Sequence, residues 1–164
     1  MRKGEKYMGK KIEILVDVFK NAETMLKVVD KVANTLSDIV EMLELDENKV
    51  DKETIFQFDS CIEFYKRYKK EMPIATGFIL SVKENLQSKN ENEKYVIIQG
   101  LVDDQDKPIK QDDENAIGRK IYAANIDEKT VKYLDGDDTK IFIVDDHSEN
   151  GSYEELSARY NAHE

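Results

Sequence analysis

Apolar residues recur every seven positions over residues 12–45. Both inward positions of the repeat are apolar throughout: Ile12, Phe19, Leu26, Ala33 and Val40 at one, Leu15, Ala22, Val29, Leu36 and Leu43 at the other. A third apolar row makes the stripe wider than the seam of a two-stranded coiled coil. The pattern predicts an amphipathic helix over residues 12–45 that packs as part of a bundle.

The start of this segment also fits a strand. Every second residue is apolar at Ile12, Ile14, Val16 and Val18, which is typical of extended chain, and Asn21 could cap a shorter helix after it. One helix over residues 12–45 would be about 50 Å long, whereas a compact chain of this size is roughly 40 Å across. The sequence therefore leaves two interpretations open: a protruding helix, or a strand followed by a shorter helix.

A second helix is predicted from Lys52 to Glu71. Asp51 is a candidate N-cap, and Pro73 is a candidate stop. One apolar row along this helix contains Ile55, Phe58, Ile62 and Tyr65. The short connection after Leu45 favours an antiparallel helical hairpin.

Strand patterns dominate after Pro73. Four segments are rich in β-branched and aromatic residues and begin near Ala75, Lys94, Gly118 and Lys140. Between the third and fourth, a short helix is predicted with Asp127 as its cap and Gly136 as its stop. The predicted fold class is α+β: an N-terminal helical hairpin, possibly preceded by a strand, and then a small antiparallel or mixed sheet. Three parts are expected, namely a basic tail (1–11), a helical region (12–72) and an acidic β-rich region (73–164).

Composition excludes several classes of protein. The chain has 164 residues and no run of 18 uncharged apolar residues, so no membrane span is expected. Cys61 is the single cysteine, which rules out an intrachain disulfide and predicts a cytoplasmic protein with a small buried thiol. The chain contains neither a glycine-rich phosphate loop nor a pair of histidines at metal-ligand spacing, so we expect no cofactor.

Acidic residues are concentrated in the second half of the chain. The net charge is −10, and residues 84–164 contain 20 acidic and 10 basic side chains. Such a field repels phosphate backbones and favours a protein partner with a basic surface, without direct nucleic-acid binding. The long connection between the second and third strands is the candidate partner-binding segment, because loops of this length are often functional. Its acidic residues are Asp103, Asp104, Asp106, Asp112, Asp113 and Glu114.

The apolar repeat predicts self-association. A helix longer than the globule would leave apolar positions uncovered unless a second copy packs on them, so we expect a homo-oligomer. The candidate residues are Ile12, Leu15, Phe19, Leu26, Val29, Leu36 and Leu43.

Two further clusters of charge have a structural and a functional interpretation. Basic residues from Lys66 to Lys70 alternate with tyrosines, and we interpret them as cations at the negative end of a helix dipole. Asp145 and Asp146 follow an apolar run, and we interpret them as the end of a strand. With His147, and with Asp103 and Asp104 if the strand ends converge, they form the alternative metal site.

Three functional hypotheses follow from the sequence. The first is a small acidic protein-protein interaction module, such as an inhibitor or an immunity-type protein that binds a basic partner. The second is a structural or assembly subunit of a larger complex. The third is a divalent-metal-dependent phosphoesterase, and we expect the chain not to be an enzyme.

Overall fold

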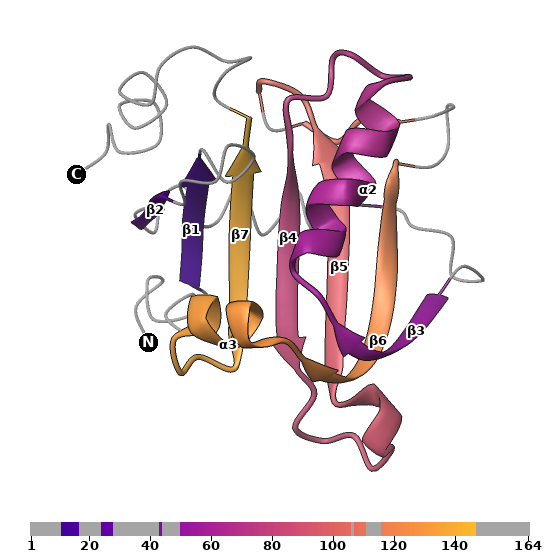
Figure 1. The fold of residues 1–164 in the computed structure, drawn as a ribbon, viewed down its shortest axis with the longest axis vertical. Helices are drawn as coiled ribbons and strands as arrows, with labels where there is room; N and C mark the ends of the chain where they lie inside the picture. The colour runs from indigo at the N-terminus through magenta and orange to yellow at the C-terminus, as the bar shows by residue number, and fades with distance from the viewer. Residues whose placement is uncertain are drawn as a thin grey trace, which may run out of the picture.

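The computed structural model describes residues 11–16, 24–27, 43, 50–105, 107–110 and 116–146, with backbone alone for 11–16, 24–27 and 145. They form one mixed sheet and two α-helices (Figure 1). The elements in chain order are β1 (Lys11–Val16), β2 (Thr24–Lys27), β3 (Val50–Phe56), α2 (Asp59–Lys69), β4 (Gly77–Glu84), the 3-10 turn η3 (Glu91–Glu93), β5 (Tyr95–Val102), β6 (Gly118–Ile126), α3 (Glu128–Leu134) and β7 (Thr139–Asp145).

The sheet has seven strands in the order β2-β1-β7-β4-β5-β6-β3. Its centre is antiparallel, because β4 pairs with both β5 and β7, and β5 pairs with β6. A parallel pair lies on each side, β1 with β7 and β3 with β6, and β2 pairs antiparallel with β1. Strands from before and after Pro73 therefore share one sheet.

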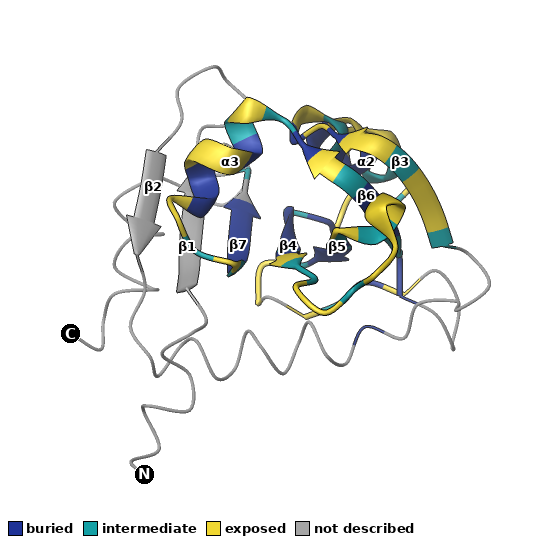
Figure 2. Cartoon of the chain, turned by 90° about the horizontal axis from the view of Figure 1, so that it is seen from below, coloured by how far each residue is buried: buried dark blue, intermediate teal, exposed yellow. Residues whose placement is uncertain are grey.

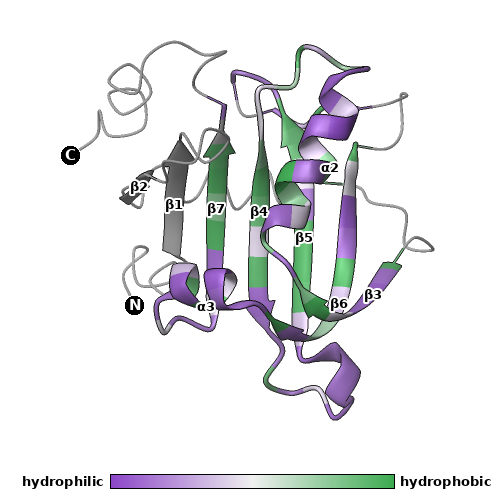
Figure 3. Cartoon of the chain, viewed as in Figure 1, coloured by the Kyte–Doolittle hydropathy of each residue, from purple (hydrophilic) through white to green (hydrophobic). Residues whose placement is uncertain are grey.

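Helices α2 and α3 pack on the same face of the sheet (Figure 1). Alternate residues of β4, β5 and β7 point toward them, as in Phe78, Leu80, Ile97 and Phe142, and all four are fully buried. Buried residues and hydrophobic residues are both concentrated on these central strands (Figures 2 and 3). Burying this apolar surface is the main term that favours folding.

The opposite face of the sheet is buried as well. Ile79 and Ile143 have no exposed surface although they point away from the helices. Leu43 is 8% exposed and lies over β5, where a Cβ added at Gly100 would come within 2.8 Å of its Cδ2 atom. Gly100 therefore provides the space in which Leu43 packs on the sheet.

The predicted helical hairpin is wrong, and so is the α+β class built on it. Residues 11–16 and 24–27 are strands, so the period-two pattern at Ile12, Ile14 and Val16 decides the structure there rather than the seven-residue repeat. The physical reason is that β-branched residues suit the middle of a sheet, and β1 is flanked by β2 and β7. The rest of the predicted helix over residues 12–45 lies outside the described residues, except Leu43.

The second predicted helix begins seven residues too early. Residues 50–56 form β3, so Asp51 lies in a strand and is not an N-cap, and the helix starts at Asp59. Ile55, which was assigned to the apolar row, is 47% exposed. Val50, Thr54 and Ile55 are β-branched and favour the extended chain that pairs with β6.

The elements predicted after Pro73 are confirmed. The four strands are β4, β5, β6 and β7, and the short helix is α3. Asp127 caps α3 by accepting a hydrogen bond from the Thr130 amide. The helix ends at Asp135 and Gly136, which have φ angles of 50° and 86°, the left-handed region typical of C-caps. Within the described residues, no helix is long and apolar enough to cross a membrane.

Candidate functional site at the ends of α2 and in the β5–β6 connection

The N-terminus of α2 is held by a residue distant in sequence. Helix α2 has no capping side chain of its own at Phe58, and the Phe58 amide donates to Asp127 Oδ2 at 3.2 Å. The other oxygen of the same carboxylate accepts from the Thr130 amide at 3.0 Å. Asp127 thus caps two helices at once, and its own amide donates to the Phe56 carbonyl. The role of this carboxylate is therefore structural.

A buried polar network joins α2 to the sheet. Gln99 on β5 is fully buried, and both ends of its amide are used: Nε2 donates to the Cys61 carbonyl at 2.8 Å, and Oε1 accepts from Arg119 Nε at 2.9 Å. Arg119 Nη2 donates to Ser60 Oγ at 2.9 Å and approaches Cys61 Sγ at 3.7 Å. Satisfied buried groups of this kind fix the helix in position over β5 and β6.

Cys61 lies inside this network and is unreactive by environment. It is fully buried, and burial raises the pKa of its thiol to about 12, with Arg119 opposing the rise. Glu53 and Asp127 add smaller contributions that also raise the pKa. A thiol with so high a pKa provides almost no thiolate near neutral pH. The interpretation of Cys61 as a small buried thiol is confirmed.

Residues of α2 and β6 form an arginine-aromatic cluster, which we define as Phe64, Arg67 and Tyr68 from α2 together with Arg119 from β6. The guanidinium carbon of Arg67 lies 5.4 Å from the Phe64 ring centroid and 4.9 Å from that of Tyr68. Arg119, from β6, lies 4.9 Å from the same Phe64 ring. Two guanidinium groups from different elements thus pack on one aromatic side chain, and cation–π attraction holds them there.

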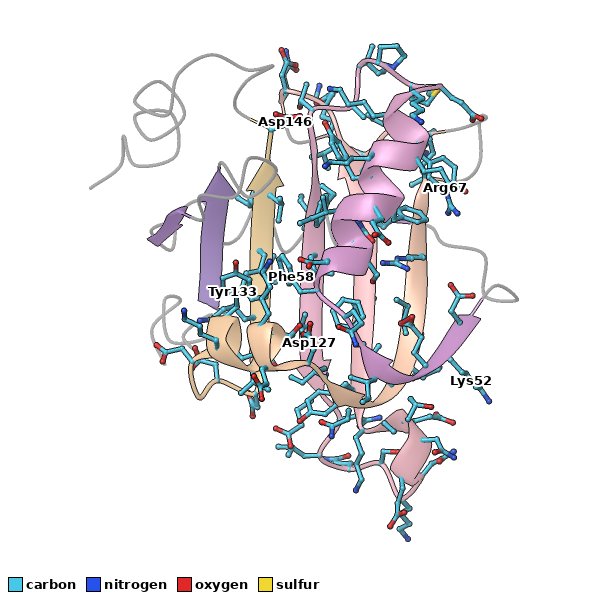
Figure 4. The ribbon with its side chains drawn as sticks, viewed as in Figure 1. Lys52, Phe58, Arg67, Asp127, Tyr133 and Asp146 are labelled. Atoms are coloured by element: carbon cyan, nitrogen blue, oxygen red, sulfur yellow. The ribbon has the colours of Figure 1, made fainter. Side chains whose placement is uncertain are left out.

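Neither arginine of the cluster forms an ion pair in the described part of the chain. Ion pairs are found elsewhere, for example between Lys129 and Asp59 and between Lys140 and Asp137. Arg67 is exposed, and Figure 4 shows it beside α2, on the side of the helix that faces β6. From the sequence, the basic stretch was expected to complement the helix dipole. Arg119 could not be recognised as a member of the cluster, because it lies 52 positions beyond Arg67 in the chain.

The β5–β6 connection begins in a fixed turn. Asp103 Oδ1 accepts hydrogen bonds from the Gln105 and Lys107 amides at 2.8 and 3.0 Å. A bridge between Val102 and Pro108 joins the connection to the end of β5, and a bridge between Lys110 and Ala116 joins two parts of the connection to each other. Within the connection, the Ile109 amide donates to the Leu101 carbonyl of β5, and the Ile109 side chain is buried in the core.

The six predicted partner-binding acids therefore divide into three groups. Asp103 is half-buried and uses its carboxylate inside the turn, whereas Asp104 is exposed. The remaining members, Asp106, Asp112, Asp113 and Glu114, lie outside the described residues. Partner binding by this segment stays a prediction.

Four of the seven predicted self-association residues fall within the described part of the chain. Ile12 and Leu15 lie on β1 and Leu26 lies on β2, where the structure gives the backbone alone. Phe19, Val29 and Leu36 fall outside the described residues. Leu43 is buried on β5 of its own chain, which assigns it to the intrachain core.

The strand ends proposed for a metal site lie at the same edge of the sheet, with β4 between them. Gly77 pairs with Val102 on one side and with Asp145 on the other, so β5 and β7 end in the same row. Asp103 and Asp146 then flank Thr76, whose amide donates to Val102 and whose carbonyl accepts from Asp146. Two strand spacings, roughly 10 Å, separate them. Among the residues that the structure describes, no three His, Cys, Asp or Glu side chains are placed to hold a metal ion; His147 and the Asp145 side chain lie outside these residues.

Comparison of the chain with protein-family models, with characterised proteins and with solved structures finds no significant match.

Proposed function

We propose that this protein is an interaction module that binds a partner with a basic surface through the acidic β5–β6 connection. The observation that carries the proposal is the way in which this connection is anchored. Asp103, Ile109 and the two bridges fix its base, while Asp104 and Gln105 are exposed. An acidic segment presented on a rigid base loses less conformational entropy on binding than a free linker does.

Charge distribution supports the same proposal. Residues 84–164 hold 20 acidic against 10 basic side chains, and the segment from Asp103 to Glu114 contributes six acids and two lysines. Such a field raises the association rate of a basic partner and lowers that of acidic ones. We also propose a cytoplasmic location, which fits a single free thiol.

The test replaces Asp104, Asp112 and Asp113 together with asparagine. Asp103 stays unchanged, because its carboxylate holds the turn. The matched control removes three exposed acids elsewhere, Glu91→Gln, Glu128→Gln and Asp138→Asn, so that both triple variants have the same net charge. Association with an immobilised lysine-rich peptide is followed at 0.05 and 0.5 M salt, since the Debye length shortens between these conditions.

We expect the connection variant to associate at least threefold more slowly than the control variant at low salt, and equally at high salt. A host-lysate pull-down with both variants then identifies the partner as a protein lost with the connection variant alone. Equal association rates of the two variants would show that only net charge matters. The acidic connection would then be a solvated surface, and the proposal would fail.

A structural or assembly subunit is the second candidate, favoured by the edge of the sheet. Strand β3 is the last strand of the order and pairs with β6 on one side. Ile55 is 47% exposed on this strand, and outer strands offer main-chain groups to a second chain. Light scattering over a tenfold dilution, with Ile55→Lys as the edge variant, tests this candidate. A monomer at all concentrations would exclude self-association under these conditions.

A further inference from the structure

We propose that the arginine-aromatic cluster of Phe64, Arg67, Tyr68 and Arg119 binds the phosphomonoester group of a phosphorylated protein side chain. The two arginines have the opposite charge to the acidic connection, and Arg119 is the second residue of β6, directly after that connection. The site goes beyond the proposed function, because that function uses the acidic residues alone.

Both arginines of the cluster have hydrogen-bond donors without an acceptor among the described residues. A guanidinium group has five N–H donors. Arg119 uses Nε for Gln99 and Nη2 for Ser60 and Cys61, which leaves Nη1 without an acceptor in the described part of the chain. Among the same residues, Arg67 is held by ring contacts alone, so all its donors are available.

The charge of the two arginines matches that of a phosphate group. Both guanidinium carbons lie within 5.4 Å of the Phe64 centroid, so the two positive charges are separated by no more than about a Debye length at 0.1 M salt. A phosphomonoester carries a charge of about −1.5 to −2 at neutral pH and has three acceptor oxygens. Its charge matches that of two guanidinium groups, whereas a single carboxylate would neutralise one. Arginine forks also fit phosphate oxygens in bidentate geometry.

Both arginines are pre-organised by contacts with neighbouring side chains. Gln99 and Ser60 hold Arg119 in place, and the rings of Phe64 and Tyr68 hold Arg67. Phe64 is 8% exposed and packs against Tyr68 with ring centroids 4.8 Å apart. Because both arginines are already ordered, binding an anion costs less side-chain entropy than it would with free surface arginines.

The surroundings decide the kind of partner. Glu63 and Glu71 are exposed one helical turn on either side of Arg67, and the whole chain carries a net charge of −10. The resulting negative potential repels a long polyanion such as nucleic acid. A compact phosphate flanked by basic residues is repelled less, because its basic neighbours are attracted. Arg67 is exposed rather than enclosed, so a free small molecule would remain mostly in water. A phosphate presented by a protein brings further contacts with it.

The experiment follows the Arg Nε resonances of the intact protein by NMR. The probes are phenyl phosphate, a phosphoserine peptide with a lysine on each side of the phosphoserine, and the same peptide without phosphate, all at constant ionic strength. We expect saturable shifts at both Arg67 and Arg119. The phosphopeptide should bind at least threefold tighter than phenyl phosphate, and the unphosphorylated peptide should produce no saturable shift.

Three variants make the test specific. Arg67→Gln should weaken phosphopeptide binding at least fivefold, and it leaves the Gln99 network intact. Glu63→Gln removes a repelling charge and should tighten binding about twofold. Lys132→Gln, an exposed lysine on α3, is the control for net charge and should leave binding unchanged.

Several outcomes would overturn the proposal. If neither phenyl phosphate nor the phosphopeptide produces a saturable shift at up to 20 mM, the site is excluded. Equal weakening by Arg67→Gln and Lys132→Gln would show that the interaction depends only on net charge. Phenyl phosphate that binds tighter than the phosphopeptide would exclude a protein as the source of the phosphate. A short single-stranded oligonucleotide that binds tighter than the phosphopeptide, with the same arginine shifts, would assign the cluster to nucleic acid.

Discussion

The two ends of α2 contrast in how their polar groups are used. At the N-terminal end, Phe58 donates to Asp127, Asp59 pairs with Lys129, and Ser60 accepts from Arg119. At the C-terminal end, Lys66, Arg67 and Lys70 are exposed and form no ion pair within the described residues. The first end is held by contacts with the rest of the fold. At the second end Lys69 donates to the Ala75 carbonyl, whereas Lys66, Arg67 and Lys70 leave their charges to the solvent or a partner.

This contrast separates stabilising groups from groups available for binding. A polar side chain whose donors and acceptors are satisfied inside the chain contributes to folding, and its removal leaves partners unsatisfied. A charged side chain with unused donors contributes little to folding and costs little to change. Substitutions at the two ends should therefore differ in the size of their effect on stability.

Asp127→Ala should produce the largest loss. The substitution removes the caps of α2 and α3 together, and each cap contributes about 1 kcal/mol, so the free energy of unfolding should fall by about 2 kcal/mol or more. Urea denaturation followed by circular dichroism measures this change. Glu128→Ala, next in sequence and exposed, should change stability by less than about 0.5 kcal/mol. A loss as small as that of the Glu128 variant would show that Asp127 caps neither helix effectively.

Gln99→Leu should have the second-largest effect. Leucine fills similar space but leaves the Cys61 carbonyl and Arg119 Nε without their buried partner, at a cost of about 1–2 kcal/mol. The same denaturation experiment applies. Gln105→Leu, at an exposed position, is the matched control and should be nearly neutral. If Gln99→Leu instead stabilised the protein, the network would contribute specificity rather than stability.

Ionisation of Cys61 should cause a smaller loss of stability, which depends on pH. Its pKa is about 12 in the folded protein and 9.0 without burial, so the unfolded chain loses its thiol proton first as the pH rises. Stability should therefore fall as the pH rises from 9 toward 12, by about 1 kcal/mol between pH 8 and pH 10. Urea denaturation at these two pH values measures the fall, and Cys61→Ala should lack this part of it. A native thiol that reacts with a disulfide reagent as fast as the unfolded one would contradict the assigned burial.

The sequence predicted the second half of the fold well because its signals are local. Strand β4 begins and ends close to its pattern, and α3 has its own cap at Asp127 and its own stop at Gly136. The start of α2 could not be predicted in this way. Its cap is Asp127, 69 positions away, so no residue next to Phe58 marks the helix boundary.

The N-terminal prediction failed where two periodicities share the same residues. Ile12 satisfies both the seven-residue repeat and the period-two pattern, and only pairing with β7, from the far end of the chain, decides between them. The candidate binding residues show the same dependence. The acidic connection is visible in the sequence, whereas the arginine-aromatic cluster requires β6 to place Arg119 against the Phe64 ring of α2.

Arg67→Gln should have the smallest effect on stability, although it lies at the centre of the proposed phosphate site. Glutamine and arginine have similar helix propensities, and Arg67 is exposed, so its loss removes two cation–π contacts worth about 0.5 kcal/mol each, the lower end of the range for exposed sites. Arg119→Gln should cost more, about 1–2 kcal/mol, because Gln99 Oε1 and Ser60 Oγ lose their donor. Urea denaturation of the two variants side by side measures the difference. If Arg67→Gln destabilised the protein as much as Arg119→Gln, the C-terminal end of α2 would contribute to folding to the same extent that the N-terminal end does, and its charge would not be free for a partner.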